Sequence, residues 1–248
     1  MEAAVTIARM LTRSLAALAT LLLLALGACS EEDAGKDSSA SDPATSATAE
    51  SSQEAGQAPS EAAGTCTYSP DGMQAAKQVD PPPAEPTETG KVDATLKTNV
   101  GDLKVVLDAG KTPCTVNSFL SLAKQGYFDD TQCHRLTTQG IYVLQCGDPT
   151  ASGMGGPGYT IPDEVDGSEK YGPGVLAMAK TQYPDSGGSQ FFLVYGDSSV
   201  LDPNYTVFGQ MDDDGLKVVK EIAAKGTADG GPDGAPKEEV TISGVTVG

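Results

Sequence analysis

The sequence predicts a mainly β domain, an eight-stranded antiparallel barrel closed by two α-helices. Eight segments show the apolar alternation that is typical of strands, and two show apolar residues at helical spacing. The two kinds of segment do not alternate regularly, as they would in a parallel βαβ fold, so we expect an antiparallel barrel with helices at its ends. The patterning begins near Val92, and the predicted domain covers residues 92–248.

A β-hairpin is predicted at the start of this domain. Apolar and polar residues alternate over 92–96 and over 103–107, and Asn99-Val100-Gly101-Asp102 between them is typical of a turn. Six further strands are predicted from similar patterns, at 132–137, 141–146, 174–179, 189–195, 205–210 and 238–247.

Two amphipathic helices are predicted from their end signals and their spacing. Thr112-Pro113 is typical of an N-cap followed by proline at the first helical position, and Gly126 ends the segment after about three turns. The second helix follows Asp213-Asp214. The residues expected to face inward are Val116, Phe119, Leu120 and Ala123 in the first helix and Leu216, Val219, Ile222 and Ala223 in the second.

Residues 1–28 are predicted to be a secretory signal peptide with a lipobox. Two arginines precede the apolar stretch 15–26, which is too short to span ~30 Å of hydrocarbon. Leu26-Gly27-Ala28-Cys29 resembles a bacterial lipobox, which implies cleavage before Cys29 and lipidation of its thiol. The alternative is ordinary signal cleavage after Ala28. Met10 is an equally suitable start, since Arg13 and the apolar stretch both follow it.

A disordered acidic tether is predicted at 29–64, followed by a Pro-rich extension at 65–91. The tether has eight acidic residues against one lysine and no apolar periodicity, so it cannot bury enough apolar surface to offset its chain entropy. Subtracting its charge of −7, and the +1 of residues 1–28, from the total of −18 leaves −12 for residues 65–248. The folded part is therefore itself acidic.

The composition excludes several classes of function. A chain with a net charge of −18 lacks the basic stripe that phosphate contacts need, so no nucleic-acid partner is expected. His134 is the only histidine, which excludes HExxH zinc proteases and other metal centres with several imidazoles. We expect no metal and a monomer.

Apart from Cys29, the chain has four cysteines: Cys66, Cys114, Cys133 and Cys146. An even number in an exported domain suggests two disulfides, for which three connectivities are possible. A metal site and free buried thiols are the alternatives, although the spacings of 48, 19 and 13 residues fit no zinc module.

Three segments match known functional motifs, but the residues in and around each match argue against the function. The GxGxxG pattern at 153–158 contains Pro157 and precedes strand-like sequence, so we predict a loop and no phosphate site. The pattern at 210–221 has EF-hand spacing, but Gln210 occupies the first ligand position, and we predict a helix cap. Ser189 precedes a strand pattern, so it lacks the strand-to-helix turn of a nucleophile elbow.

Several phrases between 113 and 209 occur in an order that resembles the cyclophilin-type peptidyl-prolyl isomerases. The resemblance covers roughly 92–248, and the family fold, an eight-stranded antiparallel barrel closed by two helices, agrees with the pattern described above. The phrases are Pro113-Cys114-Thr115-Val116-Asn117-Ser118-Phe119, His134-Arg135, Val143-Leu144-Gln145-Cys146-Gly147-Asp148, Gly153-Met154-Gly155-Gly156, Gly174-Val175-Leu176-Ala177-Met178-Ala179, Gly188-Ser189-Gln190-Phe191-Phe192 and Val207-Phe208-Gly209.

The resemblance implies roles for individual residues. Arg135 matches the catalytic arginine and Gln145 the substrate-binding glutamine. The positions that line the proline pocket and the adjoining groove are matched by Tyr142, Val143, Ala179, Phe192 and Leu201. Without the resemblance, the apolar strand pattern favours a core position for Phe192, and Arg135 fits an ordinary surface ion-pair residue; with it, the pocket is favoured for Phe192. Strand parity turns His134 away from Arg135, so we do not expect it to take part.

Departures from the family pattern concern ligand preference. Lys180 replaces an asparagine that commonly contacts the peptide backbone, and Tyr205 replaces a pocket histidine. Val200 stands where many members have the tryptophan linked to cyclosporin binding. Tyr142 and Val143 replace the usual phenylalanine and methionine, and two extra residues lie between Arg135 and Gln145.

The implied reaction is rotation about an X-Pro peptide bond, which needs no cofactor and no acid-base pair. The predicted function is therefore a foldase for proline-containing exported proteins, lipid-anchored on the extracytoplasmic face of the cell membrane. The alternative is a non-catalytic cyclophilin-fold module that binds peptides or acts as a chaperone.

Overall fold

The computed structural model describes residues 64–248. The predicted signal peptide, the predicted lipidation site Cys29 and nearly all of the predicted tether lie outside the described residues.

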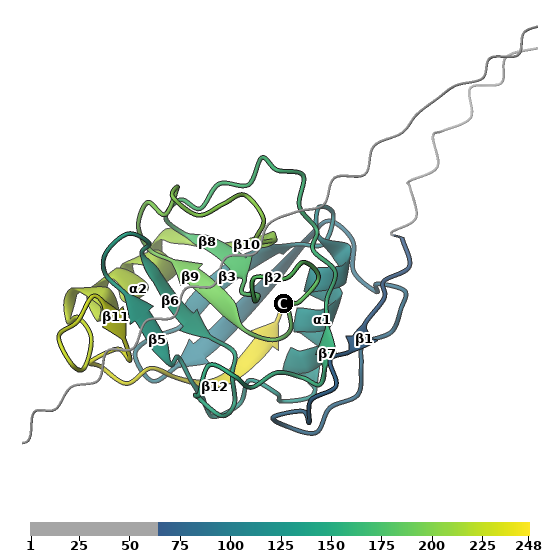
Figure 1. Ribbon diagram of the computed structural model, residues 1–248, viewed down its shortest axis with the longest axis horizontal. Coiled ribbons are helices and arrows are strands. Elements are labelled where there is room, and N and C mark those ends of the chain that lie inside the picture. Colours follow the sequence, from purple (N-terminus) through teal and green to yellow (C-terminus); the bar gives the residue numbers. More distant parts are fainter. Residues whose placement is uncertain (1–63) are drawn as a thin grey trace, which may run out of the picture. The chain divides into compact units, whose positions relative to one another are not determined.

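Ten strands form one antiparallel sheet that curls on itself (Figure 1). Their order is β11-β5-β6-β9-β8-β10-β3-β2-β12-β4. The strands span Lys91–Thr98 (β2), Leu103–Asp108 (β3), Thr131–Gln132 (β4), Arg135–Thr137 (β5), Val143–Cys146 (β6), Val175–Met178 (β8), Phe191–Val194 (β9), Val207–Met211 (β10), Asp233–Gly234 (β11) and Thr241–Val247 (β12). A separate two-stranded sheet pairs β1 (Ser69–Pro70) with β7 (Tyr159–Thr160).

The sheet curls so that β4, at one edge, is followed directly in the sequence by β5, near the other edge. β4 pairs with β12, whereas β5 pairs with β6. Between them, Cys133 N donates to Val240 O at 2.9 Å and His134 N donates to Gln145 O at 3.0 Å. The predicted strand 132–137 is therefore two strands, because the backbone changes partners there. With the short β11, this break explains why ten strands occur where eight were predicted, and the predicted fold class is confirmed.

The two helices lie at opposite ends of the curled sheet (Figure 1). α1 spans Pro113–Lys124 and contacts β3 and β12, and α2 spans Asp213–Ala224 and contacts β3 and β10. Neither of these helices, in the described part of the chain, is long and apolar enough to cross a membrane.

Carboxylates satisfy the first backbone N–H groups of both helices. Glu164, from a distant loop, accepts from Cys114 N at 2.9 Å and from Thr115 N at 2.8 Å at the start of α1. Asp212 caps α2 locally by accepting from Gly215 N at 2.7 Å. The EF-hand-like pattern at 210–221 is thus a helix cap, as predicted.

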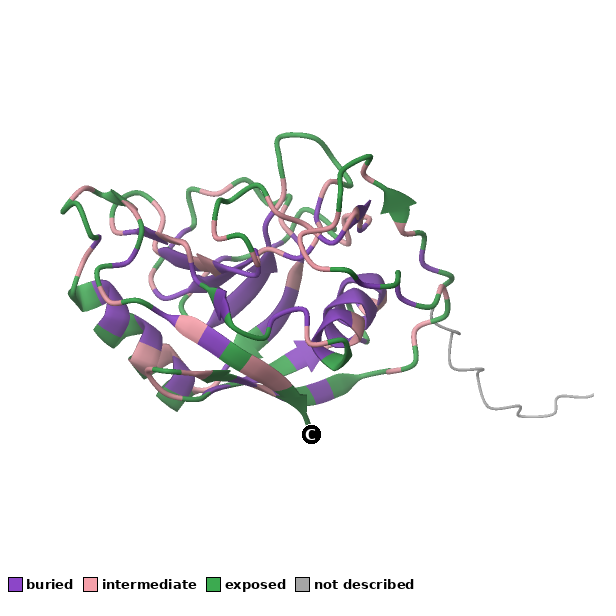
Figure 2. Ribbon diagram, turned by 90° about the horizontal axis from the view of Figure 1, so that it is seen from below, coloured by how far each residue is buried: buried purple, intermediate pink, exposed green. Residues whose placement is uncertain are grey.

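The main core fills the space between the curled sheet and the helices. Figure 2 shows that buried residues gather along the strands and on the helices. Four fully buried phenylalanines, Phe119, Phe128, Phe191 and Phe208, pack against one another at ring-centroid distances of 5.0 to 6.4 Å. Aromatic pairs at these distances stabilise a core beyond the area that they bury.

The Pro-rich extension packs against α1. The Cys66–Cys114 disulfide ties it to the first turn of the helix. Tyr68 Oη donates to Cys114 O at 3.0 Å, and Asn117 Nδ2 donates to Tyr68 Oη at 2.9 Å and to Pro83 O at 2.8 Å. Because α1 lies between the extension and the sheet, nine of its twelve residues are buried.

The second disulfide joins Cys133 to Cys146. It links the bend that closes the sheet to the last residue of β6, and both cysteines are buried. Two disulfides were predicted, and the structure selects one of the three possible connectivities.

Candidate functional site

Four neighbouring strands present a row of side chains on one face of the sheet. The register places Arg135 of β5 opposite Gln145 of β6, Gln145 opposite Phe192 of β9, and Phe192 opposite Ala177 of β8. Directly opposed residues in neighbouring strands point to the same face. The row therefore brings a guanidinium, an amide and an aromatic ring together within about 10 Å, two strand spacings.

The apolar end of the row is a buried cluster that is separate from the main core, and we call it the outer cluster. Alternation along the strands explains the separation: Phe191 belongs to the main core and Phe192 to the outer cluster. The outer cluster consists of Val143, Tyr171, Val175, Ala177, Ala179, Phe192 and Val194, with Ile141, Leu201, Tyr205 and Val207 partly buried against it.

The polar end of the row is a chain of side-chain hydrogen bonds. Arg135 Nη1 donates to Gln145 Oε1 at 3.1 Å, and Gln145 Nε2 donates to Gln190 Oε1 at 2.8 Å. Gln190 Nε2 in turn donates to Gly153 O and Gly155 O, both at 3.0 Å. The chain fixes the amide plane of Gln145 beside the outer cluster.

Arg135 also forms an ion pair with Asp233 of β11. Arg135 Nε donates to Asp233 Oδ1 and Arg135 Nη2 to Asp233 Oδ2, both at 2.8 Å. The side chains are 35% and 52% exposed, so both partners remain in contact with solvent. The hydrogen bond to Asp233 raises the pKa of Arg135, and the same contact lowers the pKa of Asp233. Both groups therefore stay charged near neutral pH.

The glycine-rich loop after β6 wraps around the buried carboxylate of Asp148. This carboxylate accepts hydrogen bonds from Gly153 N at 2.7 Å, from Gly155 N at 3.0 Å and from the backbone and hydroxyl of Thr150. Burial alone would raise the pKa of Asp148, but these hydrogen bonds outweigh it and lower the pKa. A Cβ atom on Gly155 would lie 2.0 Å from Asp148 Oδ1, so this position requires glycine. The GxGxxG pattern is thus a loop, as predicted.

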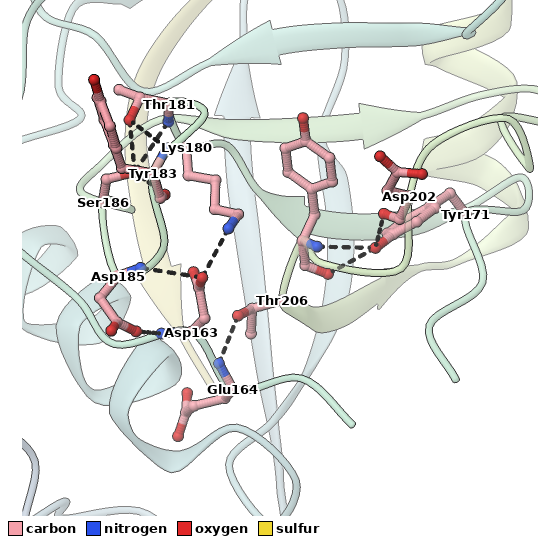
Figure 3. A network of polar contacts seen from close by, with 11 residues as sticks. Asp163, Glu164, Tyr171, Lys180, Thr181, Tyr183, Asp185, Ser186, Asp202 and Thr206 are labelled. Atoms are coloured by element: carbon pink, nitrogen blue, oxygen red, sulfur yellow. Dashed lines mark hydrogen bonds and ion pairs between the residues drawn. The ribbon is translucent and has the colours of Figure 1, made fainter. Parts of the chain in front are cut away.

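Lys180 forms an ion pair with Asp163. Its Nζ lies 2.7 Å from Asp163 Oδ2, and the two side chains are 7% and 14% exposed (Figure 3). Asp163 Oδ2 also accepts from Asp185 N at 3.1 Å. The lysine that replaces the family's asparagine therefore has its charge compensated by a neighbouring loop.

Tyr171 supports the loop that carries Leu201 and Tyr205. Its hydroxyl donates toward Tyr205 O at 3.1 Å and Asp202 O at 3.2 Å, and it accepts from Tyr205 N at 3.0 Å (Figure 3). The ring of Tyr205 lies 5.8 Å from that of Phe192. The loop thus covers Phe192, which is only 6% exposed.

A cavity of about 410 Å³ adjoins the polar end of the outer cluster. Residues from the site and from the extension line it, among them Gln145, Ala179, Gln190, Asp71, Met73 and Gln74. The extension therefore contributes to the surface beside the site although it precedes the predicted domain.

The structure brings most of the sequence-predicted site residues together. Arg135 and Gln145 lie in the row, and Val143, Ala179, Phe192, Leu201 and Tyr205 lie in or against the outer cluster.

Tyr142, Val200 and His134 lie elsewhere. Tyr142 packs against the main core, with its ring 5.9 Å from that of Tyr195. Val200 is 72% exposed. His134 lines a separate cavity of about 280 Å³, and burial lowers its pKa.

Sequence reasoning missed Asp233, Gln190 and Tyr171 as parts of the site. Asp233 lies 98 residues from Arg135 in the sequence, within a glycine-rich loop that shows no strand pattern. Gln190 belongs to a quoted phrase, and its alternation with Phe191 could have placed it on the outer face.

Comparisons with known proteins agree with this geometry. Residues 93–247 match the family described as cyclophilin type peptidyl-prolyl cis-trans isomerase/CLD. The chain is 48% identical over 193 residues to the probable peptidyl-prolyl cis-trans isomerase B of Mycobacterium leprae, a match that covers 71% of this chain and 64% of the relative. The probable isomerase B of Mycobacterium tuberculosis is 45% identical over 195 residues, covering 73% and 63%.

The chain thus spans slightly less than two thirds of the length of these mycobacterial relatives. Among solved structures, a cyclophilin type peptidyl-prolyl cis-trans isomerase of Cryptosporidium parvum matches with a TM-score of 0.57 and 30% identity. That match covers 64% of this chain and 98% of the other. With the row of Arg135, Gln145 and Phe192 in place, and with the family match over most of its length, this chain belongs to the cyclophilin-type peptidyl-prolyl cis-trans isomerases.

Proposed function

We propose that this chain catalyses the cis-trans isomerisation of X-Pro peptide bonds, with Arg135 stabilising the twisted bond. The observation that carries the proposal is the cross-strand row, which sets a permanently charged, planar guanidinium beside a buried apolar cluster. The solved Cryptosporidium relative was also crystallised in the presence of the dipeptide Ala-Pro, which supports a proline peptide as the substrate class.

The chemistry requires differential binding and no bond cleavage. Amide resonance opposes rotation with a barrier of about 20 kcal/mol. When the C–N bond twists, the proline nitrogen regains a localised lone pair that it lacks in either planar state. A guanidinium N–H that reaches this nitrogen, or the rotating carbonyl, binds the twisted state more strongly than the planar states and so lowers the barrier.

The other residues hold the substrate. Phe192, Val143 and Leu201 offer apolar surface for the proline ring, so that one side of the bond stays fixed while the other rotates. Gln145 is oriented by Arg135 and Gln190 and can bind the peptide backbone.

The test is a protease-coupled isomerisation assay on a proline tetrapeptide with Arg135→Ala. We expect kcat/KM to fall at least tenfold, because the lost contact forms in the transition state. The fold should remain intact, since a half-exposed ion pair contributes at most about 1 kcal/mol.

Lys97→Ala is the matched control, because Lys97 also forms an exposed ion pair on the sheet, 3.1 Å from Asp102. It should leave kcat/KM unchanged. Wild-type activity in Arg135→Ala would contradict the assignment, and a wild-type chain that binds the peptide without turnover would favour the non-catalytic peptide-binding alternative.

We also propose that the enzyme is exported and lipid-anchored through Cys29 on the extracytoplasmic face of the cell membrane. The lipobox-like Leu26-Gly27-Ala28-Cys29 supports this location. The two disulfides support it as well, since disulfides persist in oxidising compartments outside the cytosol. Its clients would be proline-containing segments of exported proteins.

A further inference from the structure

We propose that Asp233 is a positioning residue for the isomerase reaction: it locks the plane of the Arg135 guanidinium so that the remaining N–H groups point at the rotating bond. This inference rests on the proposed function, because it assigns Asp233 a role only through Arg135. Within the row of Arg135, Gln145, Phe192 and Ala177, the guanidinium has a single hydrogen bond, from Nη1 to Gln145. Among the described residues, its Nε and Nη2 are held only by Asp233, which lies outside the row.

The contact has the geometry of a clamp. Two parallel N–H···O bonds of 2.8 Å join one edge of the guanidinium to both carboxylate oxygens. A bidentate pair of this kind fixes the plane of the guanidinium as well as its position, which a single hydrogen bond cannot do. Arg135 is 35% exposed, so without the clamp much of its side chain would be free to reorient in solvent.

The contacts with Asp233 and Gln145 leave two N–H groups of Arg135 for the substrate. A guanidinium has five N–H groups, of which Asp233 takes two and Gln145 takes one. One N–H on Nη1 and one on Nη2 are left without a side-chain partner among the contacts of Arg135 described above. The clamp therefore leaves free donors on the two terminal nitrogens and occupies Nε, the nitrogen nearest the side-chain stem.

The fold holds Asp233 in place from both sides. β11 pairs with β5 so that Asp233 lies opposite Thr137, two residues from Arg135 on the same strand. Immediately before it, Pro232 O accepts from Thr138 N at 2.8 Å. The carboxylate of Asp229 orders the preceding turn by accepting from Thr227 Oγ1 and Gly231 N, both at 3.0 Å.

Two effects of Asp233 oppose each other at the reacting bond. Its negative charge reduces the positive potential of Arg135, whereas its hydrogen bonds fix the guanidinium before the substrate binds. The side chain of Asp233 is 52% exposed, so solvent screens its charge at distances beyond the direct contact. The hydrogen bonds act at contact distance, and we therefore expect orientation to outweigh neutralisation.

The test is Asp233→Asn in the full chain, which keeps the side-chain size but can offer only one acceptor oxygen. We expect kcat to fall about tenfold, equivalent to about 1.4 kcal/mol in the barrier. KM should change by less than about twofold, because the lost orientation matters at the transition state. Unchanged or increased kcat would overturn the proposal.

A direct readout is the hydrogen exchange of the Arg135 Nε–H group, measured by NMR. Arg135 is the only arginine after Arg13, and its resonance is identified by its loss in Arg135→Lys. We expect slow exchange in the wild type and at least tenfold faster exchange in Asp233→Asn. Equal exchange rates would show that Asp233 does not hold the guanidinium, and would overturn the proposal.

Asp229→Asn is the matched control, because it removes a negative charge from the same loop but keeps the Oδ1 acceptor that receives the hydrogen bonds from Thr227 Oγ1 and Gly231 N. It should alter neither the kcat nor the Nε–H exchange. If it lowers kcat as much as Asp233→Asn, the charge or conformation of the loop is responsible and the proposal is wrong. Failure of the proposed function is distinguishable, since it would appear as full activity in Arg135→Ala.

Discussion

Phe191 and Phe192 are neighbours in β9, yet they belong to different parts of the molecule. Phe191 is fully buried in the main core, where its ring contacts Phe119 and Phe128. Phe192 points to the other face and fills the outer cluster under Tyr205. Adjacent phenylalanines in one strand therefore stabilise the fold on one face and build the candidate binding surface on the other, because side chains alternate.

We expect Phe192→Ala to weaken peptide binding and also to destabilise the protein. Truncating a buried phenylalanine costs about 3 to 5 kcal/mol in cores, and Phe192 should lie toward the lower end because Leu201 and Tyr205, which pack against its cluster, are only partly buried. Peptide titration and urea unfolding measure the two effects separately.

Phe191→Leu is the control for this prediction, since it perturbs the same strand from the core side. It should lower stability and leave the peptide affinity of the folded protein unchanged. A folded Phe192→Ala protein with wild-type affinity would show that the outer cluster does not bind the proline ring.

The N-terminal extension acts as an element of the domain although it lacks regular secondary structure apart from β1. The Cys66–Cys114 disulfide, the β1–β7 pairing and hydrogen bonds to α1 all hold it. It covers α1 and places Met73 at the cavity beside the site. The family model matches from residue 93, so this covering lies outside the residues that the model matches.

We expect the double variant Cys66→Ser/Cys114→Ser to lose about 2 to 4 kcal/mol in the free energy of unfolding, because the disulfide closes a long loop in the unfolded chain. Urea unfolding of the purified protein measures this loss. Isomerisation of a short proline peptide should continue at its normal rate, since no residue of the row or the outer cluster lies on the extension. A chain that is equally stable without this disulfide would show that the disulfide does not stabilise the fold.

The negative charge of the whole molecule affects how a membrane-anchored domain would be placed. Residues 65–248 carry a net charge of −12, and the predicted tether adds −7. Anionic lipid headgroups repel such a chain, which would keep the domain away from the membrane to which we propose it is tied. For about 35 residues, coil scaling gives a reach of roughly 30 to 35 Å, enough to clear the headgroups.

Replacing the predicted lipidation site, in Cys29→Ser, should release a soluble and fully active enzyme from the membrane fraction. The lipid chains would be the anchor, and Arg135 lies more than a hundred residues away in the sequence. Fractionation of cells, followed by the isomerisation assay on each fraction, measures both parts. Retention of Cys29→Ser in the membrane would contradict the anchor.

Most of the fold, and three residues of the cross-strand row, could be predicted from local patterns and from the resemblance. Alternation and helical spacing are local properties, so they located both helices and most of the strands. The resemblance predicted roles for Arg135, Gln145 and Phe192, and these three residues lie opposite one another in neighbouring strands. Which distant residues meet could not be predicted in this way. The tertiary structure paired the cysteines, turned Tyr142 toward the main core, split the strand at Cys133–His134, and brought Asp233 to Arg135 across 98 residues. These outcomes depend on strand register and on the closure of the sheet, which involve every strand at once and leave no periodic signal in a single segment.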